Sequence, residues 1–296
     1  MLEITRDSFL KLNNALEEVP IESRFFGIDP FDGLNSPLIA RTFLGRSKWV
    51  RLIFVQFFKR SPINLRGLVG IKPKENPQAL AVFLRSHCLL YRLESNPKDL
   101  DTIHYLAERI IALKQKDWSG ACWSYPFAWQ ARAFYQPANM PLIIPTAYCV
   151  NALLDAHELT GESKYQQVAL SAADFIINDL NRTYDGEMFA FSYSPSDDSV
   201  VYNASLMSSQ VLSRIYSITG EQELKELARQ SVSYCLKDQN SDGSWSYGEK
   251  SYHQWIDNFH SGYNLVCLSD YALYCQEESI RPKIEKGLAY YLNTFF

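Results

Sequence analysis

The spacing of apolar residues along the chain predicts a protein built almost entirely from helices. Apolar positions recur three to four residues apart over most segments, which is the period of one face of an α-helix. Alternating patterns typical of strands are scarce. The predicted helices span residues 2–18, 37–59, 77–94, 98–116, 145–160, 163–181, 203–219, 222–238, 261–276 and 278–294.

The predicted helices come in pairs, and the pairs repeat. The segment ELTGESKYQQVALSAADFI (158–176) aligns with SITGEQELKELARQSVSYC (217–235), so that Gly161 corresponds to Gly220, 59 residues later. A glycine adopts the left-handed conformation without steric cost and therefore ends a helix readily. Each aligned segment thus reads as a turn between two helices, and the repeat predicts a series of helical hairpins.

Aromatic loops follow these hairpins. They read GACWSY (120–125), DGEMFAFSY (185–193) and DGSWSY (242–247), each ending in an aromatic residue, Ser and Tyr. A hairpin cannot bury its apolar face alone, whereas stacked hairpins can. We therefore expect an all-α fold, an (α/α) toroid of about five to six helical hairpins in a single domain over residues 1–296. Its aromatic loops would meet at one rim around a central cavity, and residues 1–75 would pack on it as a basic, amphipathic segment.

Composition agrees with a folded protein that binds something. Apolar residues make up 47% of the chain and aromatic residues 14%, and Tyr and Trp suit binding surfaces because they are amphipathic. The six cysteines form no CxxC pair, which indicates free thiols in a reducing compartment. The N-terminus carries no apolar signal-peptide core, and no apolar run reaches the length of a membrane span. We therefore expect a cytoplasmic protein.

Charge is unevenly distributed. Residues 41–74 contain nine basic residues and no acidic one. Such a block attracts a uronate polymer, a diphosphate or an acidic membrane surface, or it forms a solvated helix face. The interleaved stretch WVRLIFVQFF (49–58) favours an amphipathic helix that packs on the domain or touches lipid headgroups, so peripheral membrane association stays open.

Several motifs resemble known toroid proteins. The segment YCLKDQNSDGSW (234–245), with ALKQKDWSGACW (112–123) as a looser copy, resembles the Gln-Trp repeat of terpenoid-cyclase-like α/α toroids. The segments GIDPFDGLNSPL (27–38), SPINLRGLVGI (61–71) and WIDNFHSGYNL (255–265) are similar to toroid proteins of bacterial exopolysaccharide and capsule gene clusters. This resemblance implies a role in making or modifying surface polysaccharide, without implying a reaction.

Other toroid chemistries fit the sequence less well. The segment DPFD (29–32) is not the Asp-x-Asp-Asp acid of class II cyclases, and no Cys precedes a His as in lanthionine cyclases. The spacing of Asp257, His260 and Cys267 matches no prenyltransferase zinc site. We therefore expect no metal, no cofactor and no nucleic-acid partner, and we rank an isoprenoid cyclase last.

Candidate catalytic residues come from two loops. Asp257 and His260 lie three apart, so their side chains can face one way at a helix start, and a His beside a carboxylate can act as general acid or base. Asp29 and Asp32 are further candidates, since glycosidic bond chemistry uses two carboxyl groups. The alternatives are a structural Asp–His hydrogen bond and a turn with a helix cap.

Candidate substrate-binding residues are cationic, polar or aromatic. Arg66, beside Asn64, can pair with a carboxylate or phosphate, or with another helix. Aromatic rings stack on the apolar faces of sugars, although the tryptophans can instead wedge between hairpins as structure. The aromatic candidates are Trp123, Tyr125, Tyr193, Trp245, Tyr247, Trp255 and Tyr263.

Two functions follow as hypotheses. The first is an enzyme acting on a poly- or oligosaccharide, anionic or lipid-linked, as a glycosidase or as a lyase or epimerase at a uronate, with Tyr193 or Tyr247 as proton donor. The second is a non-catalytic glycan-binding or scaffold protein of a membrane-associated synthesis complex. The second needs the aromatic residues and the basic block but no catalytic acid.

Overall fold

The computed structural model describes residues 11, 15, 18–40, 42–130 and 135–296. The chain divides into two compact units. Unit 1 comprises residues up to 80 together with 126–138, and unit 2 comprises residues 81–125 and 139–296. The basic segment expected at 1–75 therefore shares its unit with a second stretch of chain. The predicted helix 2–18 lies almost wholly outside the described residues.

Unit 1 is made of short elements around a small core. Its helices are α2 (Ile21–Arg24), α3 (Pro37–Ala40) and α4 (Lys48–Arg60), with 3-10 turns at 32–35, 43–46 and 66–69. Strands β1 (Trp129–Gln130) and β2 (Tyr135–Gln136) form a two-stranded antiparallel ladder. The buried residues of its core are Leu34, Ile39, Val55 and Ala128.

The single helix predicted over 37–59 is wrong. The segment is instead α3, a 3-10 turn and α4. Gly45 lies so close to α3 that a Cβ atom there would meet the Ile39 carbonyl oxygen at 2.3 Å. Ser47 has extended backbone angles (φ −80°, ψ 123°) immediately before α4. Apolar periodicity continues through this stretch, but the backbone turns at Gly45 and restarts the helix.

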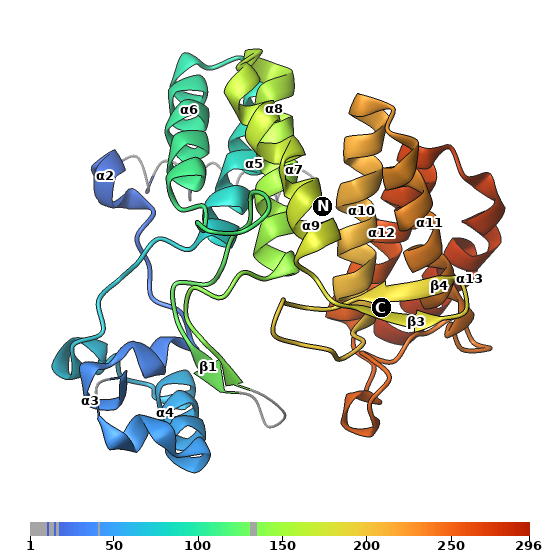
Figure 1. The fold of residues 1–296 in the computed structure, drawn as a ribbon. Coiled ribbons are helices and arrows are strands. Elements are labelled where there is room, and N and C mark those ends of the chain that lie inside the picture. The colour runs from blue at the N-terminus through green and yellow to red at the C-terminus, as the bar shows by residue number, and fades with distance from the viewer. Residues whose placement is uncertain (1–10, 12–14, 16–17, 41, 131–134) are drawn as a thin grey trace. The chain divides into compact units, whose positions relative to one another are not determined.

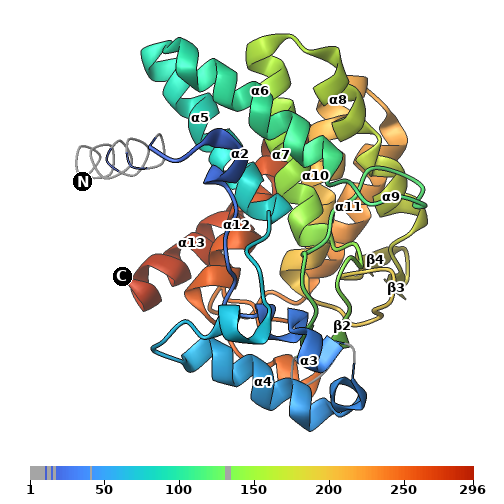
Figure 2. The ribbon, with the colours of Figure 1, turned by 90° about the vertical axis from the view of Figure 1, so that its left-hand side faces the viewer.

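Unit 2 consists of helical hairpins in sequence, seen in Figures 1 and 2. The predicted helices are confirmed here to within a few residues, except that the one predicted over 163–181 is divided at Ser171 into two. The elements are α5 (Pro77–Glu94), α6 (Pro97–Ala112), α7 (Ile143–Thr160), α8 (Ser163–Leu170), α9 (Ala172–Asn178), α10 (Tyr202–Thr219), α11 (Gln222–Lys237), α12 (Asn258–Cys275) and α13 (Arg281–Phe295), with the β-hairpin β3 (Arg182–Asp185) and β4 (Met188–Phe191). The described helices of unit 2 form four hairpins, fewer than the five to six predicted: α5–α6, α7 with α8 and α9, α10–α11, and α12–α13.

Three helices form the interior of unit 2. Helix α10 contacts both α7 and α12, and each of the three also contacts the helix that follows it in the chain. Every residue of α10 from Tyr202 to Ile215 is buried, whereas α11 buries one face only. A helix that is covered on most sides has little solvent-facing surface, and this is why α7 and α10 carry few charges. Helix α12 buries one face, while Phe259, Val266 and Leu273 on it are 60%, 57% and 69% exposed.

The aromatic loops gather at the N-terminal ends of these inner helices. The Leu142 N–H donates to the Trp123 carbonyl (3.0 Å), the Ile143 N–H to the Tyr193 carbonyl (3.2 Å) and the Tyr202 N–H to the Tyr247 carbonyl (3.2 Å). The first N–H groups of a helix have no partner within it, so the loop backbone supplies one. The prediction that the loops meet at one edge is confirmed for this unit.

The turns of the repeat have the predicted geometry. Gly161 ends α7 with φ +72° and Gly220 ends α10 with φ +76°.

None of the described helices combines the length and the apolar character that crossing a membrane requires.

Candidate functional site

The longest aromatic loop builds a cluster of rings at the start of α12. The Tyr247 and Trp255 rings stack, with centroids 4.4 Å apart and planes 12° apart. The His260 ring meets both edge-on, at 4.7 Å from Tyr247 and 5.2 Å from Trp255. Trp255 keeps 42% of its surface exposed. The cluster therefore offers an accessible aromatic ring beside an imidazole.

Asp257 orients His260 in two ways. It is the N-cap of α12, and its Oδ1 accepts a hydrogen bond from the His260 backbone N–H at 2.7 Å. Its Oδ2 lies 2.9 Å from the His260 Nδ1. A carboxylate accepts from an N–H, so this contact favours the imidazole tautomer with the proton on Nδ1 and leaves Nε2 as the basic nitrogen. The contact expected between the two side chains is confirmed; their catalytic role stays a prediction.

Tyrosines from distant parts of the chain lie beside this cluster. The hydroxyl groups of Tyr148 and Tyr263 hydrogen-bond to each other. Tyr193 interacts electrostatically with Tyr125, Tyr247 and Tyr263, and burial raises its pKa well above the ordinary value. Three loops and two inner helices thus contribute one tyrosine each to a single region.

The Tyr247 hydroxyl is a neutral hydrogen-bond donor at physiological pH. Burial raises its pKa to about 12, with Asp197 and Asp257 adding to the shift. A phenol that keeps its proton can act as an acid or as a donor to a sugar hydroxyl. The two carboxylates that influence it belong to different loops. Asp197 also accepts hydrogen bonds from the Ser199 N–H and hydroxyl group.

Trp123 and Trp245 do not line this region. They are 0% and 3% exposed. The Trp123 Nε1 donates to the Ile110 carbonyl at 2.7 Å, and the Trp245 Nε1 donates to the Cys235 carbonyl at 3.0 Å. A ring without accessible surface cannot stack on a sugar, so the predicted binding role of these two residues is replaced by a structural one. Each holds its loop against the preceding helix.

The candidates of unit 1 form a separate, internally paired group. The Arg66 Nε donates to the Asp32 Oδ1 at 2.7 Å, and its Nη2 donates to the Asp29 carbonyl at 2.9 Å. Asp29 accepts from the Phe31 N–H, and Asn64 accepts from the Arg66 N–H. Burial raises the pKa of Asp29. The structural alternative, an ion pair together with turn caps, accounts for the contacts of all four candidates.

Four buried polar atoms near the loops have no hydrogen-bond partner among the described residues. They are the Asn203 Oδ1, the His253 Nδ1, the Ser261 Oγ and the Asn264 Oδ1. Burial lowers the pKa of His253, which keeps its ring neutral. An unsatisfied buried polar atom costs about 1–3 kcal/mol, so these atoms gain stability from any hydrogen-bond partner, including water. Asn203 lies in the first turn of α10, and Ser261 and Asn264 lie in the first two turns of α12.

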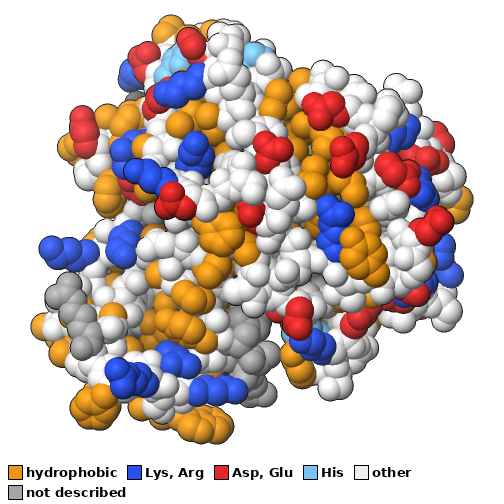
Figure 3. Space-filling model, in the orientation of Figure 1, with side chains coloured by type: hydrophobic (Ala, Val, Ile, Leu, Met, Phe, Trp, Pro, Cys, Tyr) orange, Lys and Arg blue, Asp and Glu red, His pale blue; other side chains and the backbone are white. Residues whose placement is uncertain are grey.

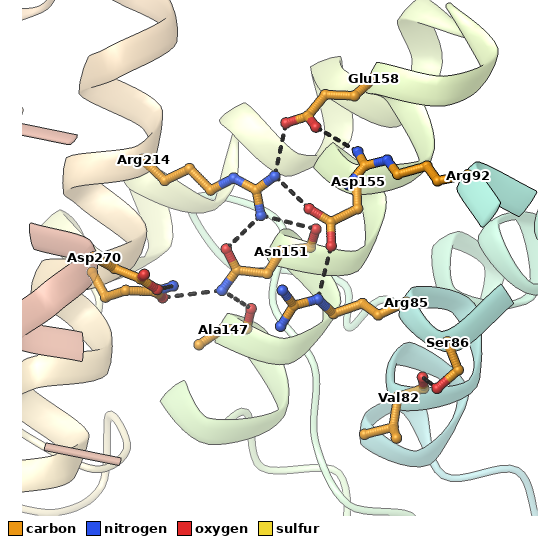
Figure 4. A network of polar contacts seen from close by, with 11 residues as sticks. Val82, Arg85, Ser86, Arg92, Ala147, Asn151, Asp155, Glu158, Arg214 and Asp270 are labelled. Carbon is orange, nitrogen blue, oxygen red and sulfur yellow. Dashed lines mark hydrogen bonds and ion pairs between the residues drawn. The ribbon is translucent and has the colours of Figure 1, made fainter. Parts of the chain in front are cut away.

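A second polar layer crosses the inner helices farther along their length (Figure 4). The Asn151 Nδ2 donates to the Gln210 Oε1 (3.0 Å), and the Gln210 Nε2 donates to the Asp270 Oδ2 (2.8 Å). One turn on, the Arg214 Nη2 pairs with Asp155 (2.5 Å) and with Glu158 (3.0 Å). This network joins α7, α10 and α12.

The sequence contained a signal for this layer. Asn151 and Gln210 are 59 residues apart, as are Asp155 and Arg214, which is the period of the glycine repeat. Equivalent positions of neighbouring hairpins therefore face each other. A polar residue at the same repeat position of two apolar helices indicates a contact between them.

Metal ligands are not gathered within the described part of the chain, where no group of three or more His, Cys, Asp or Glu residues is placed to hold an ion. All six cysteines are free and buried.

Comparison with solved structures identifies the fold. A GH76 α-mannanase of Bacteroides thetaiotaomicron superposes with a TM-score of 0.55 at 12% identity, over 73% of this chain and 59% of that chain. A cellobiose 2-epimerase of Spirochaeta thermophila gives 0.58 at 13% identity, over 75% and 61%. An unsaturated glucuronyl hydrolase of a Bacillus species gives 0.54 at 14% identity, over 90% and 73%.

These likenesses confirm the predicted α/α-toroid fold. The chain spans about three fifths of the length of the mannanase and of the epimerase. No protein-family model matches the chain, and no curated protein matches it. At this level of identity the similarity describes the architecture of the chain.

Proposed function

We propose that this chain is a carbohydrate-active enzyme that acts on an oligo- or polysaccharide at the aromatic edge of unit 2. The observation that carries the proposal is the Asp257–His260 pair, with 2.9 Å between Oδ2 and Nδ1, packed against the Tyr247–Trp255 stack. The similar structures support it, since their proteins are named a mannanase, an epimerase and a glucuronyl hydrolase. The sequence resemblance supports a place in surface polysaccharide synthesis.

The Asp257–His260 pair suits proton transfer, and we infer a uronate as the substrate. With Nδ1 held by Asp257, the His260 Nε2 takes the proton from the carbon next to the sugar carboxylate. A tyrosine hydroxyl, Tyr247 or Tyr193, then returns a proton to that carbon from the other face, which is epimerisation. If the proton goes instead to the glycosidic oxygen as its bond to the ring breaks, the reaction is elimination. Each route consumes one proton from the acid and places one on the base.

Two substitutions separate chemistry from structure. Asp257→Asn keeps an oxygen that caps α12, but its amide no longer accepts the Nδ1 proton and leaves His260 in the wrong tautomer. His260→Gln removes the base. We expect each to lower turnover at least about 100-fold, with unfolding temperatures close to that of the parent. The assay follows uronate-containing and neutral oligosaccharides in D2O by NMR, which detects deuterium uptake, unsaturated products and new reducing ends separately.

The same experiment can contradict the proposal. Undiminished turnover in Asp257→Asn would remove the pair from the mechanism. A large loss of stability in that variant would assign the pair to structure.

A non-catalytic glycan-binding role is the second candidate. It is favoured by the use of the Asp257 carboxylate as a helix cap and by the exposed Trp255 ring. It predicts glycan binding without product, unchanged by Asp257→Asn and lost in Trp255→Ala.

A further inference from the structure

One face of α4 in unit 1 exposes large apolar side chains. Trp49, Ile53 and Phe57 are spaced four residues apart and are 72%, 68% and 50% exposed. This spacing places them in one stripe along the helix. The opposite face of α4 is anchored in the core of unit 1 through Val55 and Phe58, which are 1% and 3% exposed. The helix is therefore held in place by one side, while among the described residues its other side is exposed.

The 3-10 turn before α4 adds a further exposed ring. This turn contacts α4, and its Phe43 is 78% exposed. Figure 3 shows hydrophobic and basic side chains beside one another over the region that Figure 1 labels α3 and α4. Large apolar side chains that are exposed together along one helix face mark an interaction site.

Exposed positive charge lies at both ends of the stripe. Lys48 precedes Trp49, Arg60 follows Phe57 on the same side of the helix, and Arg46 lies in the turn before α4; all three are exposed. The other arginines of α4 and its neighbouring turns have partners: Arg51 donates to the Gly45 carbonyl and Arg66 pairs with Asp32.

Exposed negative charge is lacking in the same stretch. Between residues 25 and 80 the sequence has three acidic residues, Asp29, Asp32 and Glu75. Asp32 and Glu75 are buried, and Asp29 is half-buried and engaged in a turn. The described surface of this stretch therefore presents apolar rings and cations without a compensating carboxylate.

We propose that this face of α4, with Phe43 and the flanking basic residues, docks onto a membrane surface that contains anionic lipid. Charge complementarity decides between a lipid surface and a generic apolar partner, because the exposed charged side chains described between residues 25 and 80 are all positive. A helix of 13 residues is about 20 Å long and is suited to lie in the plane of the interface with Trp49 at headgroup depth. The inference is independent of the proposed glycan chemistry.

The experiment is co-sedimentation of the full chain with vesicles. Vesicles of phosphatidylcholine alone are compared with vesicles containing 30 mol% phosphatidylserine, at low and at 0.5 M salt. We expect binding to the anionic vesicles at least 10-fold stronger than to the neutral ones, and weakened by salt. Trp49→Ser/Phe57→Ser and, separately, Lys48→Glu/Arg60→Glu should each weaken binding about 10-fold or more. Bromine-labelled lipid should quench fluorescence in the parent and much less in Trp49→Phe.

Matched controls come from unit 2. Leu89→Ser/Leu93→Ser removes two exposed apolar residues of α5, and Lys283→Glu/Lys286→Glu reverses two exposed charges of α13. Both should bind vesicles like the parent. Equal binding of the α4 variants and these controls would overturn the proposal, as would absence of binding to anionic vesicles. Concentration-dependent dimerisation of the parent, abolished by Trp49→Ser/Phe57→Ser, would instead assign the face to a second copy of the chain.

Discussion

Burial decides what each aromatic residue of the last loop does. Trp245 is covered and ties its indole N–H to the Cys235 carbonyl, whereas Trp255, ten residues later, lies against Tyr247 with 42% of its surface exposed. Both residues are tryptophans, and both belong to the loop between α11 and α12. The difference arises because Trp245 packs between α11 and α13. Its ring lies so close to Gly287 of α13 that a Cβ atom there would meet it at 2.9 Å.

The two tryptophans should respond oppositely to truncation. Trp245→Ala should lower the free energy of unfolding by about 3–5 kcal/mol, because it opens a cavity in the core. Trp255→Ala should cost about 1 kcal/mol, the value of one aromatic pair, while weakening glycan binding. Chemical denaturation and glycan titration measure the two effects; the reverse ranking would place the binding surface elsewhere.

Asp257 permits a separation of its capping role from its charge. Asp257→Ala should lower the free energy of unfolding by about 1 kcal/mol, since the first N–H groups of α12 lose their acceptor. Asp257→Asn should cost only a fraction of that, because Asn caps as well as Asp does. Urea unfolding of the two variants measures the difference, and equal losses would mean that the charge, rather than the cap, stabilises the helix.

The Arg66–Asp32 pair in unit 1 is another residue-scale case. Their side chains are 9% and 5% exposed. Arg66→Met should destabilise the protein by about 3–5 kcal/mol because it leaves a buried carboxylate without its partner. The double variant Arg66→Met/Asp32→Leu should recover part of that loss. A double-mutant cycle by urea unfolding tests this, and additive losses would show that the two residues act independently.

At the scale of elements, the repeat is expressed in helix ends and in helix contacts. Gly161 and Gly220 end equivalent helices in the left-handed conformation, and a Cβ at either position would meet no atom within 4 Å. The network of Figure 4 joins equivalent positions of α7 and α10. Repetition therefore explains both the turns and the polar layer that joins the inner helices.

Alanine at either glycine should cost nearly the same. The added methyl group meets open space, so the cost is that of a left-handed alanine alone, about 1 kcal/mol. Gly161→Ala and Gly220→Ala should therefore lower the free energy of unfolding equally, as measured by urea unfolding. A much larger effect at one of them would show that the two hairpins are not equivalent.

At the scale of the whole molecule, the thiols set a limit on alkaline stability. Burial raises the pKa of Cys88 and of Cys122 to about 12. The unfolded chain ionises these thiols from about pH 9 upward and the folded chain does not, so the stabilisation is complete below pH 9 and is lost as pH rises toward 12. Each such thiol contributes a slope of about 1.4 kcal/mol per pH unit.

Stability in reducing buffer should therefore fall steeply between pH 9 and pH 11. Urea midpoints measured across that range test the prediction. Native protein should also react slowly with a thiol reagent, and unfolded protein should expose six reactive thiols. Rapid reaction of several thiols in the native state would contradict their burial.

The sequence alone predicted most of the helices of unit 2, because long amphipathic or apolar segments carry a strong periodic signal. It also predicted the glycine ends of α7 and α10, and the contact between Asp257 and His260, because all of these depend on residues near one another in the chain. It failed at Gly45, where close approach to α3 rather than apolar period ends a helix.

Only the tertiary structure decided which candidates are accessible. Trp123, Trp245 and Arg66 resemble binding residues in sequence, but neighbours from other elements cover or pair them. The cluster of Tyr148, Tyr193 and Tyr263 contains residues up to 115 apart in the chain. The exposed stripe of α4 is exposed because the opposite face of the helix packs into the core of unit 1. Burial and long-range contacts depend on how the whole chain packs, whereas the apolar periodicity and the capping of a helix depend on residues that are close together in the sequence.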